Sequence, residues 1–387
     1  MAALKAVHVS DIPNLDQVTE NASVSLYSTR FHKPAEVGRS VFTAPRFLVV
    51  GHRGNGMNLL QSGDLRLTAI KENSILSFNA AAKFPIDFVE FDVQVTSDGI
   101  PVIFHDDFIL ADVNGVVCER RVTDLSLPEF MSYGVQREAG KVGKSLMRKT
   151  KQGRTINWNV ETDDFLCTLE EVFEKVDPPN LGFNIELKFD DYIEYQQDHL
   201  IRTLQNILKV VFDNAGDRPI IFSSFQPDAA LLTKKLQSKY PVYFLTNGGT
   251  EIFKDVRMNS LEEALNHCLD GGLQGIVSES KAVFRNPGVV NRIKESKLSL
   301  LTYGELNNVT EAVYMQQLMG VEGVIVDLVE HITDSVSKLM MPPLKEAGED
   351  EEQIDHQWQQ ESISSRPQFS QTELSFLLKL IPELLHQ

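Results

Sequence analysis

Eight short apolar segments alternate with stretches of helical periodicity across most of this 387-residue chain, and that alternation limits the folds open to it. Strands that alternate with helices favour a parallel sheet, because each helix carries the chain back to the start of the next strand. Eight such units predict a (β/α)8 TIM barrel, with a doubly wound open sheet as the alternative. The predicted strands are Phe47–Gly51, Phe88–Val95, Gly182–Lys188, Pro219–Ser224, Val242–Thr246, Gly275–Ser278, Leu298–Tyr303 and Gly323–Asp327.

Helical periodicity lies between most of these strands. The helix before the third strand begins after Thr168, and Glu171 lies three positions later, which is the spacing of a capping box. The other predicted helices are Asn73–Lys83, Ile193–Asp213, Pro227–Ser238, Ser260–Leu269, Pro287–Glu295 and Val309–Met319. Since a barrel of this kind places its chemistry at the carboxyl ends of its strands, polar residues at those ends become the candidates for function.

Three segments depart from the alternation. Residues 1–46 are irregular and predict an N-terminal arm before a barrel domain at 47–341. Residues 106–167, after the second strand, are too long for a bare loop and predict an inserted subdomain or lid. Residues 342–387 predict an acidic linker followed by an amphipathic helix at Thr372–Leu385, which either docks on the barrel or recruits a partner.

The inserted segment carries a basic run on an otherwise acidic chain. The formal net charge is -17 at pH 7, so an anionic substrate needs local positive charge to reach a site. The run contains a single acidic residue, Glu138, and it predicts either a patch that steers a phosphate-bearing substrate or a solvated loop. Its basic residues are Arg137, Lys141, Lys144, Arg148, Lys149, Lys151 and Arg154.

Charge and composition also disfavour several partners and locations. The acidic balance argues against nucleic acid or an anionic membrane surface as the main partner. No apolar run approaches the roughly 18 residues of a membrane span, so no transmembrane segment is predicted. Cys118, Cys167 and Cys268 are odd in number and far apart, which favours a reduced compartment. The cytoplasm is the predicted location, with a plastid as the alternative because residues 24–46 have the Ser, Arg and Lys of a weak transit segment.

The second predicted strand contains two carboxylates within an apolar run. Residues i and i+2 of a strand point to the same face, so Glu90 and Asp92 share one face and their apolar neighbours share the other. Two ionised carboxylates on a buried face repel each other and lose solvation, so they need a compensating cation. A metal site is the natural interpretation, and strand-end carboxylates paired with Lys or Arg are the alternative.

The third predicted strand repeats this pattern with Glu186 and Lys188 on one face. Glu186 supplies a third carboxylate, and Lys188 supplies a fixed positive charge for a phosphate oxygen. Three carboxylates suit a hard cation such as Mg2+ or Ca2+, which prefers oxygen ligands. A lone Glu-x-Lys pattern is more often a surface ion pair, so the argument depends on the convergence of several strand ends.

Two histidines complete the set of candidates. His52 follows the first strand together with Arg53, and His105 follows a short hairpin after the second strand. Imidazole titrates near neutral pH, so these residues are expected to donate and accept protons rather than to bind the metal. A metal, two imidazoles and a guanidinium are the parts of a phosphoryl-transfer site.

Eight short motifs carry a resemblance to a known family, and they are Gly51–Gly54, Glu72–Ser74, Glu90–Val93, Ser97–Val102, His105–Asp106, Glu186–Lys188, Ser224–Phe225 and Gly323–Asp327. Between about residues 47 and 330 the chain resembles the glycerophosphodiester phosphodiesterases, most closely the short soluble plant members. The resemblance implies a barrel of the phospholipase C-like phosphodiesterase type. It also implies hydrolysis of substrates such as glycerophosphocholine or glycerophosphoethanolamine to sn-glycerol 3-phosphate and an alcohol, an activity of glycerol and lipid metabolism and of phosphate homeostasis.

The resemblance implies a role for each matched residue. The implied metal ligands are Glu90, Asp92 and Glu186, the acid–base pair is His52 and His105, and the substrate contacts are Arg53, Lys188 and Glu72. In the implied mechanism a divalent metal, Mg2+ or alternatively Ca2+, binds a phosphate oxygen and the neighbouring glycerol hydroxyl. One histidine takes the hydroxyl proton, the other protonates the leaving alcohol, and water opens the resulting cyclic phosphate.

Three features depart from the usual pattern of the family and bear on the head group of the substrate. The seventh strand ends in Leu301–Gly304 where many members have a Trp-Thr pair, and the last continues as Asp327–Val329 rather than Asp-Tyr-Pro. The link Asn55–Ile70 is lengthened. The alternatives to the predicted function are a barrel phospholipase acting on intact lipid and a non-catalytic barrel acting as an interaction protein; the intact histidines and carboxylates argue against the second.

Overall fold

The computed structural model describes residues 47–113, 115–150, 152–191 and 193–340. The predicted N-terminal arm, the acidic linker and the C-terminal amphipathic helix lie outside these residues and stay predictions. No helix in the described ranges has both the length and the apolar composition needed to cross a membrane.

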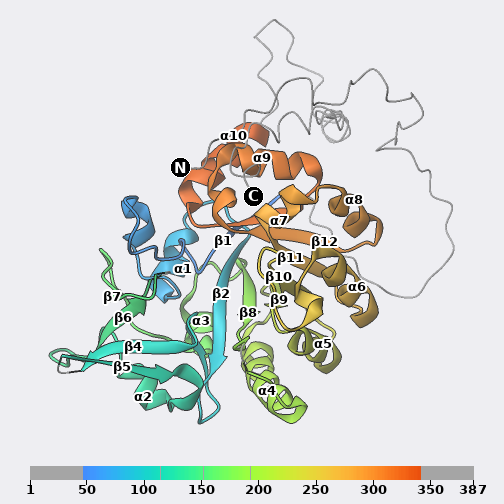
Figure 1. The fold of residues 1–387 in the computed structure, drawn as a ribbon. Coiled ribbons are helices and arrows are strands. Elements are labelled where there is room, and N and C mark those ends of the chain that lie inside the picture. Colours follow the sequence, from blue (N-terminus) through green and yellow to red (C-terminus); the bar gives the residue numbers. More distant parts are fainter. Residues whose placement is uncertain (1–46, 114, 151, 192, 341–387) are drawn as a thin grey trace, which may run out of the picture. The chain divides into compact units, whose positions relative to one another are not determined.

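Eight parallel strands close into a barrel, as the alternation predicts (Figure 1). Each strand pairs with the next along the chain, and β1 pairs with both the last strand and the second, which closes the sheet. The strands are β1 (Leu48–Gly51), β2 (Phe88–Val95), β8 (Gly182–Leu187), β9 (Ile220–Ser224), β10 (Val242–Thr246), β11 (Gly275–Glu279), β12 (Ser299–Tyr303) and β13 (Gly323–Val326). All eight predicted strands are therefore present, and the open-sheet alternative is wrong.

Helices surround the barrel on its outside (Figure 1). They are α1 (Ile75–Ala81), α3 (Leu169–Lys175), α4 (Gln197–Asn214), α5 (Pro227–Leu236), α6 (Leu261–Gly271), α7 (Ser280–Arg285), α8 (Gly288–Glu295), α9 (Thr310–Met319) and α10 (Val329–Met340). The capping box predicted for α3 is present, because the Thr168 hydroxyl accepts from the Glu171 amide and the Glu171 carboxylate accepts from the Thr168 amide. Two helices, α7 and α10, are additional to those predicted.

Alternation along each strand separates two apolar regions. Val89, Phe91 and Val93 of β2 point outward into the core between the sheet and the helices, where the Phe91 ring lies 5.2 Å from that of Phe183. A smaller cluster lies inside the barrel, and seven of the eight strands, all but β8, contribute to it; Val50 and Ile325 are two of its members. The polar side chains that point into the barrel consequently lie close to one another near the strand ends.

A second, antiparallel sheet lies within residues 106–167, in the order β5–β4–β6–β7. Its strands are β4 (Phe108–Val113), β5 (Val116–Arg121), β6 (Ser145–Lys149) and β7 (Thr155–Asn157), with the short helix α2 (Leu127–Met131) between β5 and β6. It packs on its own apolar cluster, in which the rings of Phe104 and Phe130 lie 6.0 Å apart. The chain reaches it through β3 (Pro101–Ile103), which pairs antiparallel with β2.

Candidate active site

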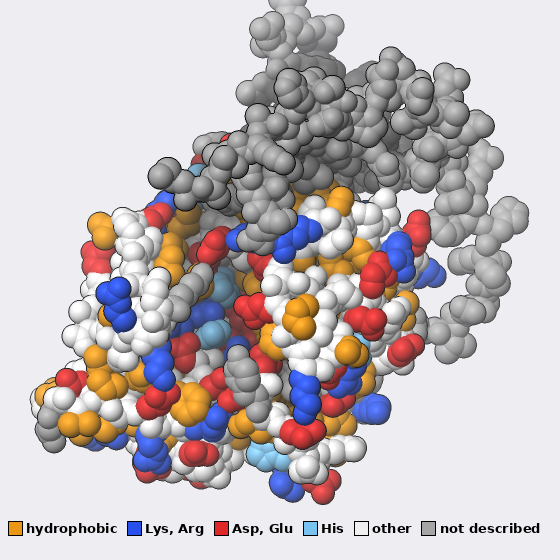
Figure 2. Space-filling model, in the orientation of Figure 1, with side chains coloured by type: hydrophobic (Ala, Val, Ile, Leu, Met, Phe, Trp, Pro, Cys, Tyr) orange, Lys and Arg blue, Asp and Glu red, His pale blue; other side chains and the backbone are white. Residues whose placement is uncertain are grey.

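Most of the predicted site residues lie on or directly after three neighbouring strands, β1, β2 and β8. His52 and Arg53 follow β1 directly, and Lys188 follows β8 directly. Some acidic, basic and histidine side chains lie together in a hollow of the face shown in Figure 2. The barrel therefore brings together residues that lie more than 100 positions apart in the sequence, because parallel strands end at the same edge.

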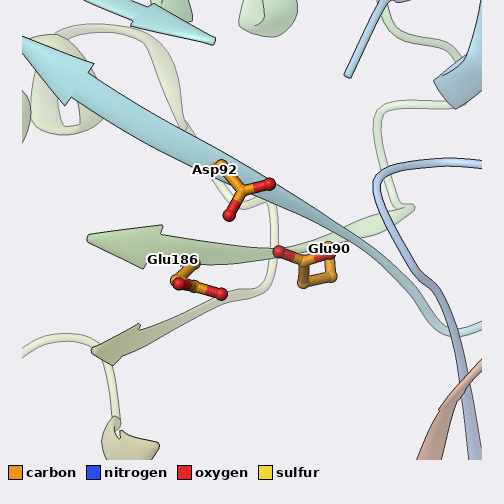
Figure 3. A group of neighbouring side chains, drawn as sticks. All are labelled: Glu90, Asp92 and Glu186. Atoms are coloured by element: carbon orange, nitrogen blue, oxygen red, sulfur yellow. The ribbon is translucent and has the colours of Figure 1, made fainter. Parts of the chain in front are cut away.

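Three carboxylates form the centre of the site. Glu90 and Asp92 of β2 and Glu186 of β8 each offer an oxygen within 4.8 Å of the others, and all three residues are buried. Their carboxylates converge from the two adjacent strands (Figure 3). The strand register explains the arrangement, since Asp92 lies opposite Glu186 in the β2–β8 pairing.

Two of these carboxylate oxygens have no hydrogen-bond partner among the described residues. Oε1 of Glu90 and Oδ1 of Asp92 are both buried and accept no hydrogen bond there. Burial of a charged oxygen without a partner is costly unless a cation neutralises it. The donor set of three carboxylates thus fits a hard divalent cation bound through oxygen.

The two carboxylates of β2, Glu90 and Asp92, have pKa values that are shifted in opposite directions. Burial, and then the nearby Asp92 carboxylate, raise the pKa of Glu90 to about 8. Burial also acts to raise the pKa of Asp92, but His105, Lys188 and Arg53 outweigh it and hold that pKa well below its usual value. A cation between the two carboxylates would favour the ionised form of Glu90 for the same electrostatic reason.

Two cations flank the carboxylates. The Lys188 ammonium lies 2.9 Å from Oε1 of Glu186 and 3.7 Å from Oδ1 of Asp92. The Arg53 guanidinium lies 3.6 Å from Oδ2 of Asp92 through Nε. Burial lowers the pKa of Lys188, but the Glu186 and Asp92 carboxylates outweigh it, so the ammonium stays charged.

The sharp turn after β1 aims Arg53 into the site. Arg53 adopts a positive φ of 49°, and its backbone amide donates to Oε2 of Glu90 at 2.8 Å. Gly54 follows with φ 94°, and a Cβ there would meet the Ser77 hydroxyl at 2.4 Å. Gly54 is thus required both because the space for a Cβ is occupied and because its φ is positive.

His52 is held by the last strand of the barrel. Its Nδ1 lies 2.7 Å from Oδ1 of Asp327, and its Nε2 lies 3.9 Å from Oε2 of Glu90. Asn308 fixes the Asp327 carboxylate by donating to Oδ2 at 2.9 Å. Burial acts to lower the pKa of His52, but Asp327 outweighs it, and the pKa lies above its usual value.

His105 is held by the aspartate that follows it in the chain. Its Nδ1 lies 2.7 Å from Oδ1 of Asp106. Burial, and then the positive charges of Arg53 and Lys188, lower the pKa of His105. The two imidazoles therefore shift in opposite directions, which is the pattern expected of an acid and a base that share one site.

Glu72 lies behind Arg53 and outside the group of three carboxylates. It accepts from Nη1 of Arg53 at 2.8 Å through Oε1, and from Nη1 of Arg148 at 3.0 Å through Oε2. Burial acts to raise the pKa of Glu72, but Arg148 and Arg53 outweigh it and hold the pKa at about 2. The contact of Glu72 with substrate stays a prediction. The next residue of this motif, Asn73, donates to Oδ2 of Asp92 at 2.8 Å.

Aromatic and acidic residues occupy the other side of the site. The rings of Phe225 and Tyr303 lie 6.0 Å apart, and the Lys188 ammonium lies 6.0 Å from the centre of the Phe225 ring. Burial, and then Glu279 and other carboxylates, raise the pKa of Tyr303 well above its usual value. This side of the site combines aromatic rings with negative charge.

The basic run of the inserted segment does not form one continuous positive surface. Arg137 pairs with Glu171, Lys149 pairs with Glu119 at 2.7 Å, and Lys141 lies 3.6 Å from Glu138. Arg148 differs, because its side chain is mostly buried and reaches Glu72 and Asp106. Steering of substrate by the run as a whole stays a prediction, and Lys151 lies outside the described residues.

Sequence reasoning assigned no individual role to three residues that contact the histidines or their partners: Asp327, Asp106 and Arg148. The first two carried a signal, since Asp327 ends the last predicted strand and Asp106 adjoins His105 in a motif. Arg148 carried none, because it is one of several basic residues in a run.

Comparison with known proteins is consistent with this geometry. A model of the glycerophosphoryl diester phosphodiesterase family matches residues 52–331. Glycerophosphodiester phosphodiesterase GDPD1, chloroplastic, of Arabidopsis thaliana is 60% identical over 383 residues, which cover 99% of each chain. Glycerophosphodiester phosphodiesterase GDPD2 of the same plant is 56% identical over 389 residues, again covering 99% of each chain.

Solved structures share the barrel at low sequence identity. A phosphodiesterase from Oleispira antarctica, in complex with the product sn-glycerol-3-phosphate, has a TM-score of 0.52 and 21% identity and covers 75% of this chain and 96% of its own. A glycerophosphodiester phosphodiesterase from Parabacteroides distasonis has a TM-score of 0.53 and 18% identity and covers 76% of this chain and 100% of its own. At such identities the similarity establishes the fold.

Proposed function

The chain belongs to the glycerophosphoryl diester phosphodiesterase family, and from that premise we propose that it hydrolyses glycerophosphodiesters to sn-glycerol 3-phosphate and an alcohol. The observation that carries the proposal is the group of three buried carboxylates on β2 and β8. Two histidines with opposite pKa shifts accompany that group, each held by an aspartate at 2.7 Å. A metal-ligand set beside an acid–base pair suits cleavage of a phosphodiester.

We propose that Glu90, Asp92 and Glu186 hold a divalent cation, with Mg2+ as the first candidate and Ca2+ as the alternative. The two buried carboxylate oxygens that accept no hydrogen bond in the described part of the chain support this assignment. When bound, such a cation supplies Lewis-acid stabilisation of phosphate oxygen and lowers the pKa of a hydroxyl beside it.

We infer that His105 is the base and His52 the acid in the first step. The lowered pKa of His105 keeps it neutral, so it takes the proton of the glycerol hydroxyl next to the phosphate as that oxygen bonds to phosphorus. The raised pKa of His52 keeps its proton available for the leaving alcohol oxygen as the bond to phosphorus breaks. The cyclic phosphate is then opened by water, with the two histidines exchanging roles.

Arg53 and Lys188 are the proposed contacts for the phosphate oxygens. Both cations are buried beside Asp92, and their charge is secured by neighbouring carboxylates. We propose that Glu72 contributes to substrate binding through Arg53, whose Nη1 donates a hydrogen bond to Oε1 of Glu72 at 2.8 Å. A fixed positive charge in a buried site stabilises the charge that builds up on the phosphate in the transition state.

The aromatic and acidic side of the site favours a cationic head group. Phe225 and Tyr303 offer ring faces and edges, and Glu279 lies near enough to influence the pKa of Tyr303. Aromatic rings with negative charge behind them suit the ammonium of choline or ethanolamine. We therefore propose glycerophosphocholine and glycerophosphoethanolamine as the preferred substrate class.

Release of sn-glycerol 3-phosphate from glycerophosphocholine tests the function. The full chain is incubated with the substrate in Mg2+, in Ca2+ and in chelator, and intact phosphatidylcholine serves as a parallel substrate. We expect product from glycerophosphocholine only when a metal is present. Product in chelator would contradict the metal role, and cleavage of the intact lipid alone would contradict the substrate class.

We further propose a plastid location, in place of the cytoplasm predicted first. The relative with 60% identity carries the description chloroplastic, and residues 24–46 have the composition of a weak transit segment. A fluorescent fusion at the carboxyl end of the full chain, viewed in leaf cells, tests this. Diffuse cytoplasmic fluorescence would contradict it.

A further inference from the structure

Arg148 is the residue of the inserted segment that contacts the partner of a catalytic histidine. It lies in β6, and its Nη2 donates to Oδ1 of Asp106 at 2.8 Å. Its Nη1 donates to Oε2 of Glu72 at 3.0 Å. One guanidinium therefore bridges a carboxylate beside His105 and a carboxylate behind Arg53.

The guanidinium of Arg148 is fixed in place by its surroundings. Its centre lies 4.2 Å from the centre of the Trp158 ring, which adds a cation–π contact. Trp158 follows β7 and donates from Nε1 to Oδ1 of Asn58 at 3.0 Å. Asn58 in turn donates its backbone amide to Glu72. Each partner of the guanidinium is thus itself held by a hydrogen bond.

Arg148 and His105 both contact the same carboxylate oxygen of Asp106. Oδ1 lies 2.8 Å from Nη2 of Arg148 and 2.7 Å from Nδ1 of His105. The carboxylate cannot rotate away from Arg148 without also changing the imidazole. The direction of the His105 ring, and with it the place of Nε2 in the site, therefore depends on a residue of the inserted sheet.

We propose that Arg148 is a positioning residue for His105, acting through Asp106, and that the inserted sheet thereby completes the active site. The inference rests on the proposed function, because it takes His105 to be the base of that reaction. The positioning role explains why Arg148 is mostly buried, which a substrate-steering role of the basic run would not explain. It also predicts that charge in the run matters less than the geometry of one member.

Arg148 and Lys149 provide a matched pair of variants, since both lie on β6 and both pair with carboxylates, but Lys149 is exposed. We expect Arg148→Ala to lower kcat for glycerophosphocholine by about 10- to 100-fold, because a small misplacement of a catalytic group has effects of this size. Lys149→Ala is expected to stay within about twofold of the unaltered protein. Equal kcat values for the two variants would overturn the proposal.

A double variant separates positioning from general stabilisation. Asp106→Asn removes the carboxylate through which Arg148 acts, so Arg148→Ala combined with Asp106→Asn should lower kcat no further than the more damaging single change. If the two effects multiply, Arg148 does not act through Asp106 and the proposal is wrong. Melting curves of all four proteins show whether loss of fold contributes.

Arg148→Lys covers the case in which Arg148→Ala does not fold. The lysine keeps the charge but cannot donate to both carboxylates in the fixed geometry of a guanidinium. We expect a folded protein with kcat lowered by about tenfold or more. Full activity of this variant would overturn the proposal. Failure of the unaltered chain to hydrolyse any glycerophosphodiester would instead refute the proposed function, so the two failures are distinct.

Discussion

The barrel and the inserted sheet hold the two proposed catalytic histidines in different ways. His52 is held by Asp327, which directly follows a barrel strand, so its position is set by the register of parallel strands. His105 is held by Asp106, which also accepts from Arg148 of the inserted sheet. One imidazole is anchored by closure of the barrel, and the other by contact between two separately packed sheets.

The difference shows that some side chains of the site are positioned more firmly than others. The carboxylates of β2 and β8 are placed by backbone pairing, which allows little adjustment. The contact from β6 depends on a long side chain and on the packing of Trp158. Variants of the metal ligands and of His52, which the barrel positions, are therefore expected to have larger effects than variants of the inserted sheet, and the following experiments test that order.

The largest loss is expected from a metal ligand. Asp92→Asn removes a charge from the group of three carboxylates, and metal catalysis supplies several kcal/mol of transition-state stabilisation. We expect kcat/KM for glycerophosphocholine to fall by about 1000-fold or more. Asp213→Asn, at an exposed residue of α4, is the control. A loss no larger than that of Arg148→Ala would break the proposed order.

Loss of the barrel-held imidazole is expected to come next. His52→Ala should lower kcat by about 100- to 10,000-fold, because it removes a general acid. His331→Ala on α10, where the side chain is exposed, serves as the control. Equal rates of product release from His52→Ala and the unaltered chain would refute the acid role.

The aspartate behind His52 controls the pH dependence. Asp327 favours the protonated imidazole, so Asp327→Asn should lower the pKa of His52. Activity that needs protonated His52 is lost as the pH rises through this pKa, so the alkaline limb of the kcat profile should move to lower pH. Arg148→Ala should leave that limb in place. A common shift in both variants would show that the two histidines are not held independently.

Metal binding is expected to stabilise the barrel in a pH-dependent manner. Because the pKa of Glu90 rises from 4.5 to about 8 on folding, its contribution to the stability of the metal-free protein becomes more favourable as the pH falls between those values. Mg2+ competes with that proton, so it should raise the melting temperature more above pH 8 than at about pH 6. At a hundredfold excess over its dissociation constant the gain is about 2.7 kcal/mol.

Matched variants decide where this stabilisation originates. The double variant Glu90→Gln with Asp92→Asn should show no increase in melting temperature with Mg2+. Arg148→Ala should keep the full increase, because it is not among the proposed ligands. An increase that survives in the first protein would place the metal elsewhere.

The smallest effect is expected on the side of the site remote from the inserted sheet. Tyr303→Ala should raise KM for glycerophosphocholine about fivefold relative to glycerophosphoglycerol, as expected for loss of a cation–π contact of about 1 kcal/mol. Arg148→Ala should change both substrates alike. An equal change in both KM values for Tyr303→Ala would contradict the proposed head-group contact.

Much of the barrel follows from local pattern. The eight apolar segments predict the eight strands, and the capping box at Thr168 predicts the start of α3. The six-residue helix α7 is too short for a periodic signal and follows β11 without a break. The strands of the inserted sheet escape prediction because most residues of β5 are exposed, so no buried apolar run marks that strand.

The site is predictable only where strand ends supply it. Glu90, Asp92 and Glu186 stand out as charged residues in apolar strands, and the structure brings them together. Arg148 stands among exposed basic neighbours, and its burial depends on Trp158 and Glu72, which are distant in sequence. Prediction of such a contact requires knowledge of how the two sheets pack together, and no local sequence pattern contains that information.

The contact of Arg148 with Asp106 also links activity to local unfolding. The inserted sheet packs on an apolar cluster separate from the main core, so we expect it to open locally while the barrel remains intact. Opening would release Arg148 from Asp106 and leave His105 without a fixed direction. On heating, activity should therefore decline before the barrel melts, and the rate of hydrolysis becomes a measure of the stability of the inserted sheet.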